Sequence, residues 1–189
     1  TVIVPSFTFV STALAFIREG ARVVFADVER ETLGIDPHHV AELIDHSTRA
    51  VVAVHYAGVG CDLRGLQDTL AGHERVDLVE DNAHGLFGRY EGRPLGSFGR
   101  MSAVSFHETK SFICGEGGAL VLNDPADVDR ANVLYEKGTD RRAFEDGTVD
   151  NLKESIEYRV YELFATQQPM AGDLRTLLAV LRILQEVQL

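Results

Sequence analysis

The stretch that decides the fold is MSAVSFHETK (residues 101–110), followed closely by GEGGALVL (residues 115–122). An apolar run ends at Phe106, a lysine follows four residues later, and a glycine-rich turn leads into a second apolar run. Short runs that are apolar throughout are typical of strands buried on both faces of a parallel sheet. The pattern therefore predicts two strands, with Lys110 in the connection between them.

Similar apolar runs alternate with helical patterns over the first 150 residues. The predicted strands are Thr1–Val4, Arg22–Ala26, Arg49–Val54, Val76–Glu80, Met101–Phe106 and Gly118–Leu122. The predicted helices are Val10–Glu19, Pro37–Asp45, Leu63–Leu70 and Pro125–Lys137. Alternation of this kind predicts a layered α/β domain.

The character of the sequence changes near residue 150, because 16 of the 17 glycines precede it. Beyond it, Ile156, Val160 and Leu163 have the spacing of one apolar helix face. Pro169 interrupts the pattern, and a second run of leucines at helical spacing follows. Two amphipathic helices around a break predict an α-helical hairpin over residues 151–189.

Composition excludes several classes of protein. The net charge of −11 and a pI near 5.0 disfavour nucleic-acid binding, since an acidic surface repels phosphate. Two cysteines form neither a disulfide framework nor a metal site, so we expect reduced thiols, a cytoplasmic location and no metal. The sequence contains neither a membrane span nor a signal peptide. It begins without Met inside an apolar run, so we expect a piece of a longer chain.

Two residues at predicted strand ends could carry chemistry. Asp81 directly follows the strand Val76–Glu80, and ligands of parallel α/β sheets bind at the carboxyl ends of strands. The alternative for Asp81 is the N-cap of a following helix. Lys110 could be a solvated surface charge, but desolvation between two apolar strands would favour the neutral amine that condenses with a carbonyl. A third segment, PSFTFVST (residues 5–12), offers either hydroxyls and aromatics for a flat ligand or simple capping and core packing.

Several segments together resemble the DegT/DnrJ/StrS family of sugar aminotransferases. They are PSFTFVST (5–12), HYAG (55–58), EDNAH (80–84), SFHETK (105–110), GEGG (115–118) and YEKGTDR (135–141). The resemblance implies the sheet core of a type I PLP-transferase (aspartate aminotransferase-like). Residues 1–150 would be a truncated fragment of its large domain.

The resemblance also implies roles for individual residues. Lys110 would hold pyridoxal 5′-phosphate (PLP) as a Schiff base and move protons, and Asp81 would pair with the pyridinium nitrogen. Ser105 would donate a hydrogen bond to the cofactor phosphate, and Phe9 would stack on the ring. His84 would lie beside the ring hydroxyl, although a histidine taken on its own is more often a core or surface residue.

Within the family, the motifs resemble the branch that aminates dTDP-4-keto-6-deoxyglucose. Glutamate would be the amino donor, and the intact protein would be a homodimer whose cofactor sites lie at the subunit interface. The family's N-terminal phosphate-binding loop and its C-terminal domain lie outside this sequence, so the resemblance leaves open whether this chain is active.

Residues 151–189 resemble a different family. The segment ATQQPMAGDLR (residues 165–175) is similar to part of the PhoU-type phosphate-uptake regulators, which are helical bundles. The preferred interpretation of this segment is a helical hairpin that serves only in packing. An alternative function for the whole chain is thus a PhoU-like regulatory or interaction protein with a non-catalytic α/β half, and a third is a fold fragment without activity.

Overall fold

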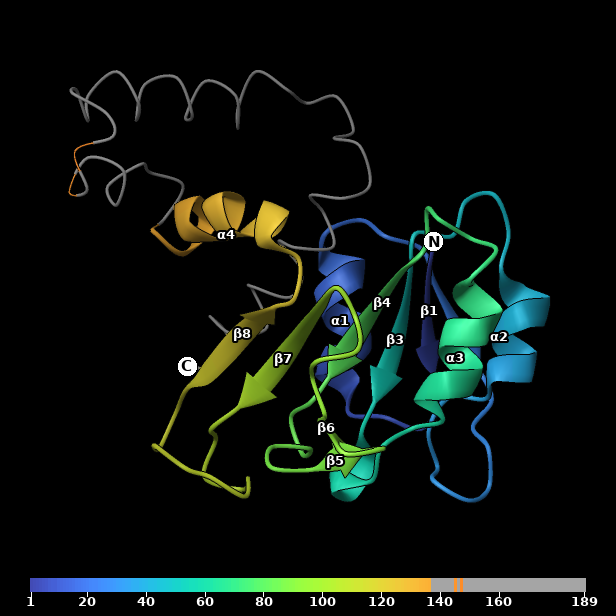
Figure 1. The fold of residues 1–189 in the computed structure, drawn as a ribbon, viewed down its shortest axis with the longest axis horizontal. Coiled ribbons are helices and arrows are strands. Elements are labelled where there is room, and N and C mark those ends of the chain that lie inside the picture. Colours follow the sequence, from blue (N-terminus) through green and yellow to red (C-terminus); the bar gives the residue numbers. More distant parts are fainter. Residues whose placement is uncertain (137–144, 146, 148–189) are drawn as a thin grey trace.

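A computed structural model describes residues 1–136, 145 and 147 of the chain. Its centre is a six-stranded sheet with the strand order β2-β1-β3-β4-β7-β8 (Figure 1). The strands are β1 (Val2–Pro5), β2 (Val23–Ala26), β3 (Ala50–Val54), β4 (Asp77–Asp81), β7 (Met101–Ser105) and β8 (Gly118–Leu122). The first five are parallel, and β8 pairs with β7 antiparallel. The carboxyl ends of β1, β3, β4 and β7 therefore lie along one edge of the sheet.

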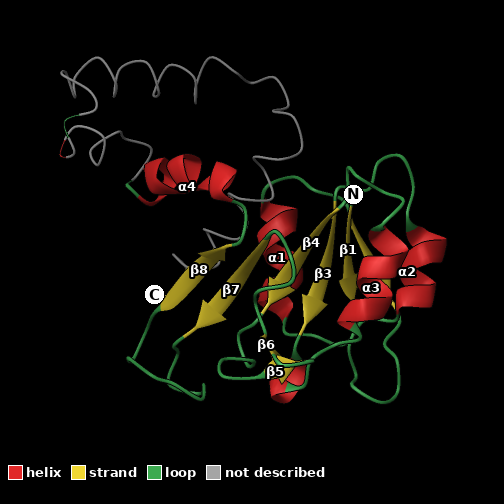
Figure 2. Cartoon of the chain, viewed as in Figure 1, coloured by secondary structure: helices red, strands yellow, loops and turns green. Residues whose placement is uncertain are grey.

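Helices cover both faces of this sheet (Figure 2). They are α1 (Val10–Arg18), α2 (Pro37–Leu43), α3 (Leu63–Leu70) and α4 (Val128–Tyr135), with 3₁₀ turns at Tyr56–Gly58 and Pro125–Asp127. Successive residues of β3 alternate between two buried clusters: Val52 packs with α1, whereas Val51 packs with α2 and α3. This alternation places β4 residues Asp81 and Glu80 on opposite faces, with Asp81 on the α1 side.

Local signals in the sequence determine where α2 and α3 begin. Asp36 accepts a hydrogen bond from the His38 N–H, and Pro37 occupies the first turn of α2. Asp62 accepts one from the Gly65 N–H at the start of α3. Each such cap stabilises a helix by about 1 kcal/mol.

The predicted α/β alternation is confirmed, and each strand lies within one residue of its predicted bounds. The direction of β8 is a correction to the expected parallel sheet. A parallel pair needs a crossover, usually a helix, whereas the connection from Phe106 to Gly117 contains none. The last described helix starts at Val128 rather than Pro125, because Pro125–Asp127 forms the 3₁₀ turn.

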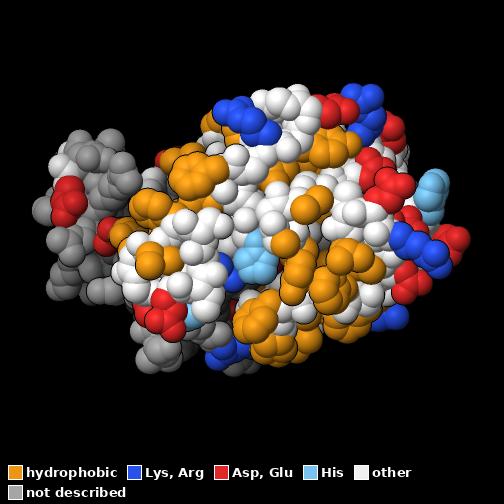
Figure 3. Space-filling model, turned by 90° about the horizontal axis from the view of Figure 1, so that it is seen from below, with side chains coloured by type: hydrophobic (Ala, Val, Ile, Leu, Met, Phe, Trp, Pro, Cys, Tyr) orange, Lys and Arg blue, Asp and Glu red, His pale blue; other side chains and the backbone are white. Residues whose placement is uncertain are grey.

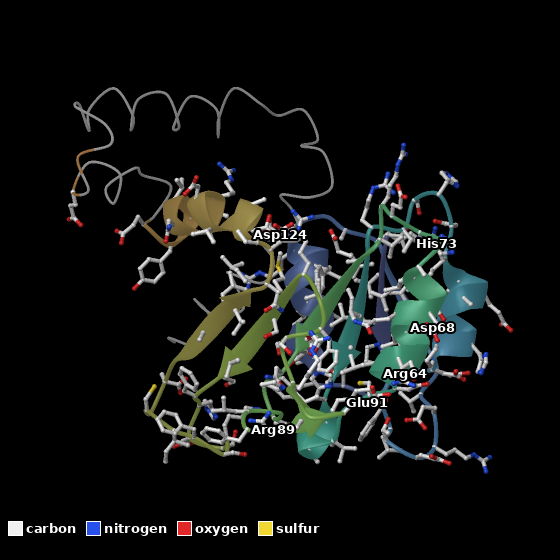
Figure 4. The ribbon with its side chains drawn as sticks, in the orientation of Figure 1. Arg64, Asp68, His73, Arg89, Glu91 and Asp124 are labelled. Atoms are coloured by element: carbon white, nitrogen blue, oxygen red, sulfur yellow. The ribbon has the colours of Figure 1, made fainter. Side chains whose placement is uncertain are left out.

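Two further differences concern the segment after β4. The N-cap alternative for Asp81 requires a helix directly after it, but residues 83–87 form turns. A two-stranded hairpin that was not predicted then follows, made of β5 (Arg89–Tyr90) and β6 (Arg93–Pro94). Glu91, in the turn of this hairpin, forms a surface ion pair of 2.7 Å with Arg64 of α3 (Figure 4). The helical hairpin predicted for residues 151–189 lies outside the described residues.

None of the helices within the described part of the chain has the length and apolar character needed to cross a membrane.

Candidate active site

A cavity of about 620 Å³ opens at the carboxyl edge of the parallel strands. Its walls come from the segments that follow β1, β3, β4 and β7 and from the first turns of α1. All five predicted site residues line it: Phe9, Asp81, His84, Ser105 and Lys110. Figure 3 views the molecule from this side, where hydrophobic side chains surround a hollow in which a histidine is visible. Both the volume and the position are typical of small-molecule sites in α/β sheets, whose cavities measure about 300–1,000 Å³.

Asp81 is the last residue of β4, and each of its carboxylate oxygens receives one hydrogen bond. The Thr12 hydroxyl lies 2.7 Å from Oδ2, and the Ala83 N–H donates to Oδ1 at 3.2 Å. Because no helix follows Asp81, its side chain does not serve as a helix N-cap. A carboxylate oxygen accepts more than one hydrogen bond, so Asp81 retains lone pairs for a ligand in the cavity.

Lys110 and His84 are in direct contact, with 3.0 Å between Nζ and Nε2. The backbone N–H of Ala57 donates to Nδ1 of His84 at 3.2 Å and holds the ring in place. The pKa of His84 is lowered by burial and then by the nearby Lys110, while Asp81 opposes the shift. His84 thus holds the lysine amine in the cavity.

Aromatic side chains form one wall of the site. The Tyr56 ring meets His84 edge-on at 5.3 Å, and Phe7 packs against Tyr56 at 4.5 Å between ring centroids. Phe9 is 70% exposed and lines the open side of the cavity. Sequence reasoning assigned no role to Tyr56, although the HYAG segment that contains it was among the family motifs.

Ser105 ends β7 and begins the loop that carries the lysine. Its Oγ accepts a hydrogen bond of 3.4 Å from the His107 N–H, which leaves the hydroxyl hydrogen available to an anion. The loop is held by a bond of 2.9 Å between His107 Nδ1 and the Thr109 hydroxyl, and by the Lys110 N–H, which donates to the His107 carbonyl. These contacts fix the backbone that presents Lys110 to the cavity.

On the opposite face of β4, Glu80 is fully buried and accepts four hydrogen bonds. His55 Nε2 and the Gly96 N–H lie 2.8 and 2.7 Å from Oε2, and the N–H groups of Phe98 and Gly99 lie 2.6 and 2.7 Å from Oε1. Burial alone would raise the pKa of Glu80, but the bonds from His55 and from the backbone lower it on balance. The carboxylate is therefore ionised and ties two loops to the strand that carries Asp81.

Glycine makes this arrangement possible at two positions. Gly96 has φ +90, and a Cβ there would lie 2.7 Å from the Ser102 hydroxyl oxygen. A Cβ on Gly99 would lie 2.4 Å from the carbonyl oxygen of Leu78. The loop can therefore close around Glu80 only with glycine at these positions.

The side chains that converge on the cavity fit PLP. An amine, a carboxylate, a hydroxyl donor and an aromatic face match the aldehyde, ring nitrogen, phosphate and ring of this cofactor. The carboxylate lies at the end of β4, and the amine lies in the loop that follows β7, the strand paired with β4. His84 lies close enough to both groups for each to influence its pKa.

Comparison with known proteins identifies the family of the fold and the site. Residues 1–166 match the model of the DegT/DnrJ/EryC1/StrS aminotransferase family. The spore coat polysaccharide biosynthesis protein SpsC of Bacillus subtilis (strain 168) is 38% identical over 143 residues, which cover 76% of this chain and 36% of SpsC. The family match passes the boundary expected at residue 150, and the resemblance of residues 151–189 to PhoU gains no support.

Solved structures agree with this assignment. DesI, determined with its TDP-sugar product, is 39% identical with a TM-score of 0.70, over 74% of this chain and 35% of DesI. A sugar aminotransferase of Streptococcus pneumoniae, Spr1654 in its PLP form, is 27% identical with a TM-score of 0.63, over 71% of this chain and 38% of that chain. It has also been solved in a PMP form, so PLP, the cofactor expected from the sequence, is confirmed for the family. The chain spans about a third of the length of these relatives.

Proposed function

Because the chain belongs to the DegT/DnrJ/EryC1/StrS aminotransferase family, we propose that it forms the PLP-binding core of a nucleotide-sugar aminotransferase. One observation carries the proposal: the Lys110 amine and the Asp81 carboxylate line the same cavity from adjacent strand ends. His84 lies between the two groups, since its ring contacts the Lys110 amine and the charge of Asp81 raises its pKa against the effect of burial.

When bound, PLP supplies an electron sink for charge that develops at the substrate carbon. Lys110 would hold the cofactor covalently through Nζ and would then move a proton at the reacting sugar carbon. His84 contacts the lysine amine and would position it for this role. Asp81 would accept a hydrogen bond from the ring nitrogen, and Ser105 would donate its free hydroxyl hydrogen to the phosphate.

The substrate we propose is a nucleotide-linked 4-keto-6-deoxy sugar of the dTDP type, with glutamate as amino donor. Support comes from DesI, whose structure was determined in the presence of its TDP-sugar product, and from the dTDP branch of the family that the sequence motifs resemble. We also propose that the intact protein is a homodimer, as the family resemblance implies.

The function is tested by titrating the purified chain with PLP and recording its absorption spectrum. We expect a visible band that borohydride abolishes while fixing the cofactor covalently. Lys110→Ala should lose the band but retain its far-UV circular dichroism. Lys137→Ala, which removes another of the three lysines in the sequence, is the matched control and should behave as wild type. An unchanged band in Lys110→Ala would show that the lysine assignment is wrong.

A further inference from the structure

Thr12 is a hydroxyl residue in the first turn of α1. It lies in the PSFTFVST segment, but no individual role has been assigned to it above. Its side chain is 1% exposed and lines the cavity floor beside Asp81. Helical threonines commonly bond a carbonyl of their own helix three or four residues earlier. Thr12 instead reaches a carboxylate 69 residues away in the sequence, at 2.7 Å. A buried hydroxyl directed at another element indicates a role beyond helix formation.

We propose that Thr12 is a positioning residue, which directs its hydroxyl hydrogen onto Oδ2 of Asp81 and so aims this carboxylate at the ring nitrogen of PLP. The inference rests on the proposed function and adds a residue to it.

The direction of the hydrogen bonds follows from the groups involved. An ionised carboxylate only accepts, so Thr12 must donate to Asp81. A hydroxyl has one hydrogen, so the contact of 2.8 Å between Thr8 and Thr12 must run from the Thr8 hydroxyl to Thr12. The two threonines therefore form a directed chain that ends on Asp81. A chain of this kind strengthens its final bond, because each donor polarises the next.

This chain has one consequence for a bound ring. The Thr12 hydroxyl and the Ala83 N–H hold one oxygen each, so Asp81 cannot rotate without losing a charge-assisted bond. The orientation in which the carboxylate meets the ring nitrogen is therefore fixed by these two donors.

The test compares three variants of the full chain. Thr12→Val keeps the shape and removes the hydroxyl, Thr12→Ser keeps the hydroxyl, and Thr8→Val removes only the outer link. The readouts are the Kd for PLP and the pH at which the visible band of the complex titrates. Urea unfolding of each apo-protein reports stability separately, and Thr12→Ala replaces Thr12→Val if the latter does not fold.

We expect Thr12→Val to weaken PLP binding by about 10- to 100-fold, as for a lost bond to a charged group, and to shift the titration of the band. Thr12→Ser should stay within about threefold of wild type, and Thr8→Val should fall between the two. Wild-type affinity and titration in Thr12→Val would overturn the inference, as would equal losses in Thr12→Val and Thr12→Ser. If the wild type itself forms no covalent PLP complex, the proposed function fails and this inference fails with it.

Discussion

Replacing the buried Glu80 by Gln should destabilise the domain strongly while preserving side-chain shape. In the wild type, the two carboxylate oxygens accept two hydrogen bonds each. An amide can accept at its oxygen only, so its NH₂ group would face two donors, for example His55 and Gly96. Each hydrogen bond to a charged group contributes about 1.5–3 kcal/mol to stability. Removing one partner of a buried ion pair costs about 3–5 kcal/mol. We therefore expect a loss of about 4 kcal/mol.

Urea unfolding at pH 7.5, followed by circular dichroism, measures this loss. With a urea dependence of about 2 kcal/mol/M, the midpoint should fall by about 2 M. Glu91→Gln is the matched control: Glu91 also forms an ion pair, but with the exposed Arg64, so its midpoint should not change measurably (Figure 4). A decrease below about 1 kcal/mol in Glu80→Gln would refute the four-donor account of Glu80.

The pH dependence of the same difference provides a second check. The folded-state pKa of Glu80 lies below its ordinary value of 4.5, so its charge stabilises the fold fully above that pH. The contribution is lost as the pH falls through the lowered folded-state pKa. The difference in unfolding free energy between wild type and Glu80→Gln should thus be constant from pH 7.5 to about 5 and decrease below 4.5. A gap that widens on acidification would contradict the sign of the shift.

The other predictions concern the cavity and the thiols. The folded-state pKa of His84 lies below its ordinary value of 6.5, so its neutral form stabilises the fold above that pH and this contribution is lost as the pH falls through the folded-state pKa. Wild type should therefore lose more unfolding free energy than His84→Gln between pH 7 and 5, and parallel profiles would argue against a neutral His84. Ser105→Ala should raise the Kd for PLP by about tenfold with unchanged stability, since one hydrogen bond to phosphate is lost; an unchanged Kd would remove Ser105 from the site. Burial raises the pKa of Cys61 to about 12, whereas Cys114 is exposed, so a thiol reagent should label Cys114 rapidly and Cys61 only after unfolding. Rapid labelling of both cysteines in the native protein would contradict this burial.

The sequence predicted the sheet and the strand-end positions of Asp81 and Lys110, because apolar runs and the chemistry that follows them are local signals. It did not predict the direction of β8, which depends on the absence of a helix between residues 106 and 117. Nor did it predict the contact between Thr12 and Asp81, which joins residues 69 apart. Long-range hydrogen bonds of this kind depend on the packing of α1 against the sheet. The periodicity of apolar residues predicts the helix and the strands but not the contacts between them.

The same limit applies to Glu80 and Tyr56. Glu80 and Asp81 are neighbours in the sequence, yet the alternation of a strand sends the two side chains to opposite faces. Three of the four donors around Glu80 come from a glycine-containing loop 16 to 19 residues later, and the fourth, His55, lies 25 residues earlier. Tyr56 lies in a 3₁₀ turn after β3, and its contact with His84 became visible only from the structure.

We propose that one lysine, Lys110, binds the cofactor. The chain contains three lysines, Lys110, Lys137 and Lys153, so peptide mapping can distinguish Lys110 from the other two. The purified chain is incubated with PLP, reduced with borohydride and digested, and the mass of each lysine-containing peptide is measured by mass spectrometry. We predict a stoichiometric phosphopyridoxyl adduct on Lys110 alone. Equal labelling of all three lysines, or an adduct on Lys137 or Lys153 instead, would contradict the account.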